Sequence, residues 1–199
     1  MTPFEHLEAV AAPFPLSNVD TDQIIPARFL QKPRRDGYAD FLFRDLRLDE
    51  SGAPRQNFIL NQPQFASARI LVAGRNFGCG SSREGAVYAL WDSGFRSVIA
   101  PSFGDIFFNN SLKNGFLPII LAQSDVDDLL TVLSATPGAR LSIDLSDQSV
   151  KDPDGTIRRF EIDPFIKQCL LRGVDELEYT LSLTSEIAAF EARTAAATE

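Results

Sequence analysis

Cysteine and histidine are scarce in this chain of 199 residues. Its only thiols are those of Cys79 and Cys169, and its only imidazole is that of His6. Two cysteines cannot build a disulfide framework. These side chains also fall short of the roughly four ligands that a structural zinc ion or an iron–sulfur cluster usually takes. We therefore expect the chain to hold no metal by itself.

Long apolar runs and a surplus of basic residues are missing as well. No stretch approaches the roughly 18 unbroken apolar residues of a membrane-spanning helix, and the start, MTPFEHLEAVAAPFPL, lacks the features of a signal peptide. The formal net charge is −8, which disfavours binding to nucleic acid or to an anionic membrane surface. The sequence predicts a cytoplasmic protein, in which a few converging arginines could still bind a small anion.

What the chain does contain is a regular alternation of strand and helix signals. Apolar runs predict strands at residues 69–73, 97–100 and 117–121. A helix is predicted after each strand, at residues 82–93, 105–114 and 125–134. Short connections between alternating elements favour parallel pairing. We therefore expect one α/β domain, residues 1–199, with a mainly parallel central sheet.

The remaining segments extend this domain. Residues 141–145 and 156–162 flank a DPDG turn and predict an additional antiparallel hairpin. Two further helices and a frayed tail are predicted at residues 163–173, 184–194 and 195–199. Residues 31–57 predict a long loop with a short helix near residues 38–43. A loop of this length inside a compact domain is usually functional.

The segment NFGCGSSREG, residues 76–85, lies where the first predicted strand passes into its helix. It does not match a nucleotide-binding loop. A P-loop requires the sequence GK[ST], which is absent, and the dinucleotide-binding pattern requires glycine where Arg83 stands. Two other interpretations remain open.

One interpretation is structural: Ser81 and Glu84 have the S-x-x-E spacing of a capping box, and the glycines would allow a tight turn. The other is an anion site. Backbone N–H groups at a helix N-terminus lack intrahelical partners, and Gly78 and Gly80 would let a ligand approach them closely. Arg83 adds a forked cation suited to a carboxylate. Open α/β sheets usually bind ligands at the carboxyl ends of their strands, where this turn lies.

Three segments of the chain, in order, resemble one known family. NFGCGSSRE at residues 76–84 is similar to the signature of the mobile C-terminal domain of the aconitase superfamily, and in particular of 3-isopropylmalate dehydratase small subunits. NVDTDQIIPARFLQK at residues 18–32 and VIAPSFGDIFFNNSLKNGFLPI at residues 98–119 are similar to motifs of the same family. The resemblance covers nearly the whole chain and implies a swivelling β/β/α three-layer domain.

The resemblance also implies an activity and a partner. The family isomerises 2-isopropylmalate to 3-isopropylmalate through 2-isopropylmaleate, a hydro-lyase reaction of leucine biosynthesis. A separate large subunit, joined in a heterodimer or heterotetramer, is expected to carry a [4Fe–4S] cluster whose iron would hold the leaving hydroxyl. The scarcity of cysteine agrees with this expectation, because two cysteines cannot hold such a cluster and the chain would have to rely on that of its partner.

Functional roles follow for positions that match the family's signature. Ser81 would be the base that takes the C–H proton, with its anion stabilised by the helix N-terminus and Arg83. Arg83 would also hold a substrate carboxylate, together with backbone N–H groups from Gly80 to Ser82. A serine that serves as base cannot be fully engaged as a helix cap at the same time.

The N-terminal motif carries the remaining implied residues. Asp22 would support the site by hydrogen bonding, or it caps a turn. Phe29 and Leu30 match the loop that sets substrate preference and would face the isopropyl group, or they simply pack in the core. Arg34 and Arg35 are available to a second carboxylate, or they are solvated surface charges.

The match departs just after the signature. The family's usual His-Ala-Pro-Trp is replaced by GAVY, which begins at Gly85. Glycine is less favourable than most residues in a helix, and here it removes a titratable side chain beside the site. Two alternatives therefore stay open: a paralogous hydro-lyase subunit for a related 2-alkylmalate such as methylmalate or dimethylmalate, and a non-catalytic binding or regulatory subunit.

Overall fold

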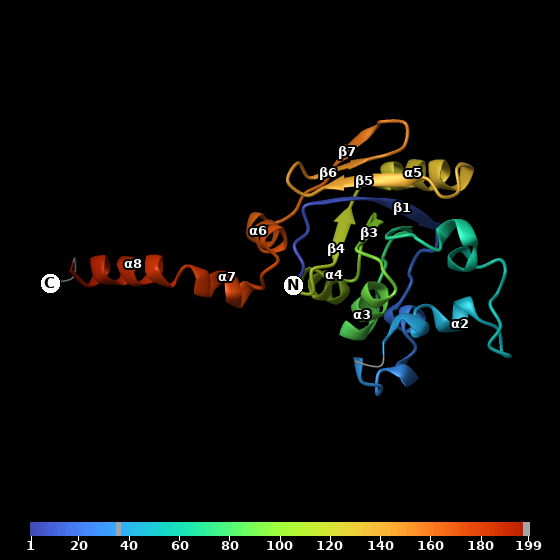
Figure 1. Ribbon diagram of the computed structural model, residues 1–199, viewed down its shortest axis with the longest axis horizontal. Coiled ribbons are helices and arrows are strands. Elements are labelled where there is room, and N and C mark those ends of the chain that lie inside the picture. The colour runs from blue at the N-terminus through green and yellow to red at the C-terminus, as the bar shows by residue number, and fades with distance from the viewer. Residues whose placement is uncertain (35–36, 197–199) are drawn as a thin grey trace.

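The computed structural model describes residues 1–34 and 37–196 (Figure 1). The strands are β1 (His6–Phe14), β2 (Ile70–Ala73), β3 (Ser97–Ala100), β4 (Leu117–Ile120), β5 (Arg140–Asp144), β6 (Ser149–Lys151) and β7 (Ile157–Arg159). The helices are α1 (Thr21–Ile24), α2 (Arg44–Arg47), α3 (Glu84–Asp92), α4 (Asp105–Lys113), α5 (Gln123–Ala135), α6 (Pro164–Arg172), α7 (Glu176–Ser182) and α8 (Thr184–Ala196). Short 3-10 helices lie at Ala27–Phe29, Ala39–Phe41, Ile59–Asn61 and Pro63–Phe65.

The strands form one seven-stranded sheet in the order β4-β3-β2-β1-β5-β6-β7 (Figure 1). β1 to β4 pair in parallel. β5 joins β1 in antiparallel fashion, and β6 and β7 continue that half of the sheet. β1 is therefore shared between a parallel half and an antiparallel half. The predicted α/β fold, a parallel sheet with an antiparallel addition, is confirmed.

The two central parallel strands, β2 and β3, are buried on both faces. All four residues of β2 are buried, and their side chains alternate between two apolar cores. Leu71 and Ala73 join the first core, whereas Ile70 and Val72 join the second. α3 packs in the first core and α5 in the second, so the sheet lies between these two helices (Figure 1). The first core lies on the side of the sheet where the NFGCGSSREG turn enters its helix.

The antiparallel half differs from the prediction. The hairpin at the DPDG turn joins β6 to β7, and Lys151 pairs with Ile157. Residues 141–145 do not pair with residues 156–162, because β5 lies between β1 and β6. β1 itself, HLEAVAAPF, carries no strong strand signal, since three of its nine residues are alanine. It is a strand because it has a hydrogen-bonded neighbour on each side.

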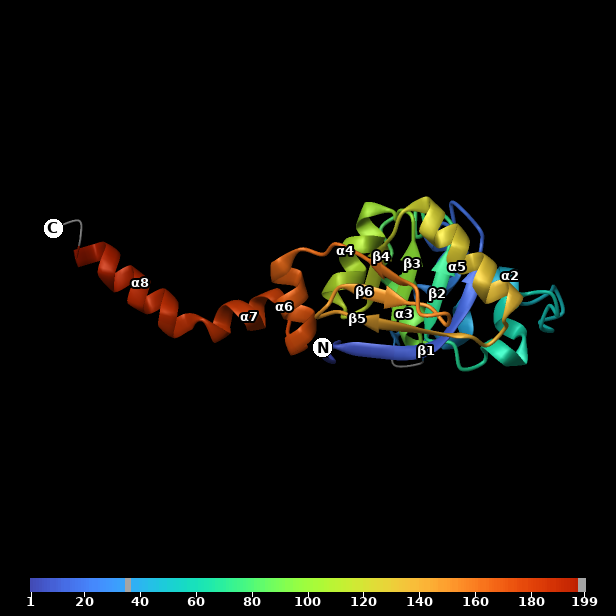
Figure 2. The same cartoon turned by 90° about the horizontal axis from the view of Figure 1, so that it is seen from above.

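The last two helices extend away from the sheet (Figure 2). α6 and α8 confirm the helices predicted at residues 163–173 and 184–194, and α7 was not predicted. α8 continues to Ala196, and the end of the expected frayed tail, residues 197–199, lies outside the described residues. Leu177, Leu181 and Phe190 are 66%, 62% and 61% exposed. None of the described helices is both long and apolar enough to cross a membrane.

Candidate active site

Three loops meet at the carboxyl ends of β1, β2 and β3. The backbone N–H of Gly78 donates to the Val19 carbonyl at 2.7 Å, and that of Thr21 donates to the Cys79 carbonyl at 2.9 Å. The N–H of Gly104 donates to the Phe77 carbonyl at 2.9 Å. The loops after these strands therefore hold the NFGCGSSREG turn from both sides. This is the edge of the sheet at which α/β proteins usually bind ligands.

Two glycines make this close contact possible. Gly78 has a φ of +72°, and a Cβ atom on it would lie inside the van der Waals radius of the Phe107 ring. A Cβ atom on Gly104 would lie 2.5 Å from the Gly78 carbonyl oxygen. Both positions therefore exclude any larger residue. Gly80, with a φ of +92°, meets only ordinary contacts, so it is selected by its backbone conformation.

The serines lie outside the helix that follows. α3 begins at Glu84, and the residue before it, Arg83, makes no capping hydrogen bond through its side chain. The predicted capping box of Ser81 and Glu84 is therefore wrong. Ser81 and Ser82 are exposed, and their hydroxyl groups hydrogen-bond no other described residue. Ser81 is fixed instead through its carbonyl oxygen, which accepts from Thr21 Oγ1 at 3.0 Å.

Backbone donors of the turn are also unpaired. Within the described chain, the N–H groups of Gly80, Ser81 and Ser82 find no protein acceptor. They lie directly before the N-terminus of α3, whose partial positive charge favours an anion. These unpaired donors make the turn a candidate anion site.

Arg83 is held against the turn by Asp22. The Nη1 atom of Arg83 forms an ion pair with Asp22 Oδ1, and the Arg83 side chain is only 16% exposed whereas that of Asp22 is 52% exposed. The same carboxylate oxygen accepts from the Ala27 N–H at 2.7 Å. The hydrogen bond from Arg83, followed by that from Ala27, holds the pKa of Asp22 below its ordinary value. Asp22 thus fixes the orientation of the guanidinium.

The predicted preference loop forms a separate aromatic cluster. Phe29 stacks on Phe41 with ring centroids 4.3 Å apart, and the Arg28 guanidinium lies 4.6 Å from the Phe29 ring centroid. Lys32 lies over the Phe41 ring at 4.9 Å. Leu30 is half-buried and packs against the first core. The contacts of Phe29 and Leu30 are thus with the first core and the aromatic cluster.

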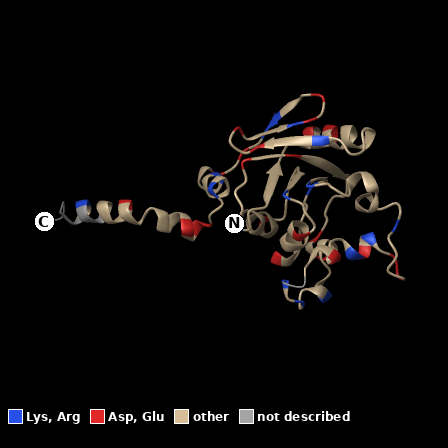
Figure 3. Cartoon of the chain, viewed as in Figure 1, with Lys and Arg blue, Asp and Glu red and all other residues tan. Residues whose placement is uncertain are grey.

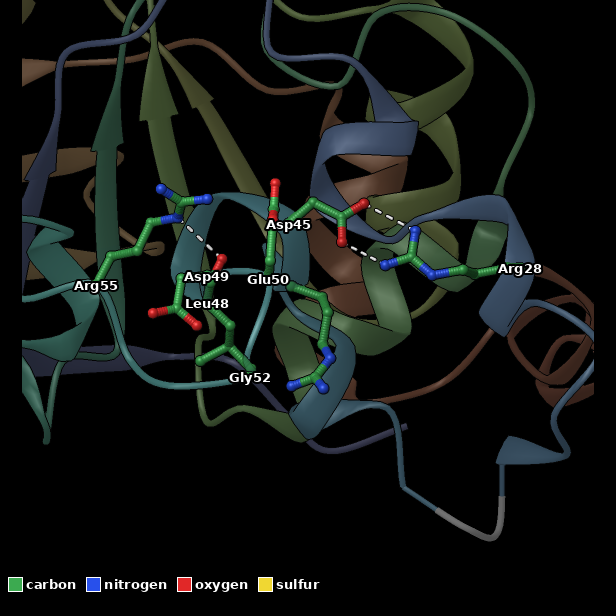
Figure 4. Close-up of a pocket in the computed structure, with 8 residues that line it drawn as sticks. Arg28, Asp45, Leu48, Asp49, Glu50, Gly52 and Arg55 are labelled. Carbon is green, nitrogen blue, oxygen red and sulfur yellow. Dashed lines mark hydrogen bonds and ion pairs between the residues drawn. The ribbon is translucent and has the colours of Figure 1, made fainter.

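Two cavities flank the Arg28–Asp45 ion pair. One of about 420 Å³ includes Asp22 and Pro26 in its lining, and the other, of about 390 Å³, includes Arg55 and Leu48. Arg28 binds Asp45 through both of its terminal nitrogens and borders both cavities (Figure 4). α2 beside them contains two basic residues and one acidic residue, Arg44, Arg47 and Asp45 (Figure 3). Neither cavity is lined by the serines of the turn or by residues 29 and 30.

Known proteins are similar to this chain in sequence and in fold. The family model of the aconitase C-terminal domain matches residues 1–124, and the model LeuD_N matches residues 127–164. The 3-isopropylmalate dehydratase small subunit of Dinoroseobacter shibae is 49% identical over 99% of this chain and 98% of its own length. That of Brevibacillus brevis is 49% identical over 97% of this chain and all of its own.

The chain belongs to the family of 3-isopropylmalate dehydratase small subunits. A crystal structure titled 3-isopropylmalate dehydratase (leuD), from Methanocaldococcus jannaschii, superposes with a TM-score of 0.65 at 28% identity. The match covers 94% of this chain and 99% of the other. The resemblance read from the three motifs is therefore confirmed, as is the swivelling fold that it implies.

The described part of the chain offers no ligand set for the expected iron–sulfur cluster. Among the residues that the structure describes, no three His, Cys, Asp or Glu side chains gather where they could hold a metal ion. Cys79 lies in the turn, where burial raises the pKa of its thiol, and Cys169 is buried in α6. Two thiols also fall short of the roughly four that such a cluster usually takes. These residues do not fit an iron–sulfur cluster.

Some contacts of the site carry no signal in the sequence. Thr21, 2% exposed, bonds the Ser81 carbonyl across a separation of 60 residues. Arg34, expected at a substrate or in solvent, lies 3.7 Å from the Tyr88 ring centroid and pairs with Asp92 at 3.6 Å. Arg35 lies outside the described residues. These partners are distant in sequence, and only the folded chain brings them together.

A titration tests the ion pair of the site. The Asp22 carboxyl is expected to titrate below its ordinary pKa of 3.8, because the Arg83 hydrogen bond favours the carboxylate. Its stabilising contribution is present above pH 3.8 and is lost as the pH falls through the lowered pKa. In an Arg83→Gln variant, NMR should show the midpoint moving up towards 3.8. The Asp49 carboxyl, whose pKa is lowered by a hydrogen bond from Ser51, is the control and should not move.

Proposed function

We propose that this chain is the small subunit of an active 3-isopropylmalate dehydratase. With a large subunit it would convert 2-isopropylmalate to 3-isopropylmalate through 2-isopropylmaleate, in leucine biosynthesis in the cytoplasm. The observation that carries the proposal is the turn at residues 80–83, which offers free serine hydroxyls, unpaired backbone donors and an oriented arginine at the ligand-binding edge of the sheet.

Ser81 is proposed to take the C–H proton of the substrate. A serine hydroxyl is a poor base unless its anion is stabilised. The neighbouring unpaired N–H groups and the N-terminus of α3 supply positive partial charge for this purpose. Exposure of Ser81 leaves its hydroxyl open to a substrate from the partner's side.

Arg83 is proposed to bind a carboxylate of the substrate. Asp22 engages one terminal nitrogen, and the other guanidinium nitrogens of Arg83 bond no described residue. A guanidinium can therefore present a second edge to a carboxylate while Asp22 holds the first. Gly80 and Ser82 would contribute their backbone N–H groups, and Asp22 acts as a positioning residue.

The alkyl group of the substrate is proposed to meet the segment that contains Phe29 and Leu30. Both side chains are apolar and only partly buried in the isolated subunit. Burying a branched alkyl group against them would contribute about 1.5–3 kcal/mol. Contacts of this size favour isopropylmalate over a smaller 2-alkylmalate without excluding the smaller one.

The large subunit is proposed to bring the [4Fe–4S] cluster, since this chain's side chains do not fit one. The cluster supplies Lewis-acid chemistry to the leaving hydroxyl when it is bound. This chain would then contribute the proton transfer and the binding of the substrate carboxylate. The complex would be a heterodimer or heterotetramer.

Reconstitution tests the proposal. Each subunit alone, and the two together, are assayed anaerobically for hydration of 2-isopropylmaleate through the loss of its ultraviolet absorbance. Turnover should require both subunits. A complex that forms but hydrates no alkylmaleate would support the non-catalytic alternative, and preference for methylmaleate would support the paralogue.

A further inference from the structure

Gly85 stands in α3 without a backbone reason. It is the second residue of the helix and is not among the residues with positive φ. Alanine is more favourable than glycine in such a position. A reason other than backbone conformation must therefore favour glycine at position 85.

Two side chains occupy the space beside Gly85. A Cβ atom on Gly85 would lie 2.7 Å from Leu30 Cδ2 and 3.3 Å from Tyr38 Cε2. Real Cβ atoms essentially never show the first of these distances. Leu30 and Tyr38 therefore pack directly onto the backbone of α3, and a larger residue at position 85 would force both side chains to move.

Both residues control the position of segment 28–32. Leu30 belongs to the segment, and its N–H donates to the Ala27 carbonyl at 3.1 Å. The Tyr38 hydroxyl donates to the Lys32 carbonyl at 2.8 Å, and the Tyr38 N–H donates to Asp92 Oδ2, at the end of α3, at 3.1 Å. The segment is thus attached to α3 through a leucine and a tyrosine that meet at Gly85.

We propose that Gly85 is a positioning residue for substrate selection: its missing side chain lets Leu30 and Tyr38 close on α3, which fixes the distance between segment 28–32 and the turn with Ser81. The inference rests on the proposed function, because the segment would contact the alkyl group of a 2-alkylmalate. No hydrogen bond of the described residues joins Ser81 or Arg83 to Leu30, so we expect this packing to act on substrate binding more than on the chemical step.

Kinetics of the reconstituted complex test the inference. Gly85→Ala should raise the KM for 2-isopropylmalate about 10-fold and leave kcat within about twofold, with a smaller change for 2-methylmalate. Adding Leu30→Ala to Gly85→Ala should raise the KM by less than the product of the two single effects, because the new methyl group then has room. Leu30→Ala alone is the matched control. Equal changes for both substrates, or a double variant worse than the sum of the single ones, would overturn the inference.

Proteolysis of the isolated chain tests the packing without any activity. Gly85→Ala should speed tryptic cleavage after Arg28 and Arg34 several-fold relative to cleavage after Arg193 in α8. Leu133→Ala, a fully buried change in the second core, measures how far a general loss of stability alters that ratio, and Gly85→Ala should alter it more. An unchanged ratio in Gly85→Ala refutes the positioning role. If the wild-type complex turns over neither substrate, the proposed function fails, and proteolysis still decides whether Gly85 positions the segment.

Discussion

Replacing Ser81 with alanine should lower the kcat of the reconstituted complex by about 10²–10⁴-fold, the range expected when a positioned base is lost. The substitution removes a hydroxyl that bonds no other described residue, so the fold has no contact to lose. Thr21 holds Ser81 through the backbone carbonyl, which alanine keeps. Substrate affinity should therefore stay near the wild-type value, because Arg83 and the backbone donors are unchanged.

Ser82→Ala is the matched control for this prediction. Ser82 is the same residue type, one position along, and is equally exposed. Its proposed contribution is a backbone N–H, which alanine also provides. Initial rates of the two variants, measured with the same large subunit, should therefore differ by at least about 100-fold. Equal rates would remove the special role of Ser81.

Gly78→Ala is expected to destabilise the chain by about 2–5 kcal/mol. A non-glycine residue in the left-handed region costs about 1–2 kcal/mol. Gly78 is also buried, and its new Cβ atom would overlap the Phe107 ring, which adds overpacking of about 1–3 kcal/mol. Urea denaturation followed by circular dichroism measures the loss as a lower midpoint.

Gly52→Ala separates the two contributions. Gly52 also has a positive φ, +83°, but no atom lies within 4 Å of a Cβ atom placed on it. The free energy of unfolding of this variant should therefore fall only by the cost of the left-handed backbone conformation, about 1–2 kcal/mol. If Gly78→Ala costs no more than Gly52→Ala, the close contact between the turn and α4 is not what selects glycine.

The parallel half of the fold could be predicted because its signals are local. A strand such as β2 is buried on both faces, so four consecutive apolar residues identify it. β1 could not be recognised in this way, because its alanines carry little preference and its strand form depends on neighbours far along the chain. The pairing of β5 is set by β1 for the same reason.

The site shows the same division. The glycines and serines of the turn, and the forked cation of Arg83, are visible in the sequence as a candidate anion site. The capping box was a wrong interpretation, because contacts from residues 21 and 22 hold the turn in another conformation. The packing of Leu30 on Gly85 also joins distant segments, and no local pattern indicates it.

Exchange of the substrate's C–H hydrogen with solvent tests the central claim most directly. Complexes with wild-type, Ser81→Ala or Ser82→Ala chain are incubated with 2-isopropylmalate in D₂O, and NMR follows the loss of the hydrogen that dehydration removes. We predict that Ser81→Ala binds substrate normally but slows this exchange by at least about 100-fold, whereas Ser82→Ala does not. Exchange at the wild-type rate in the Ser81→Ala complex would contradict the assignment of the base to this turn.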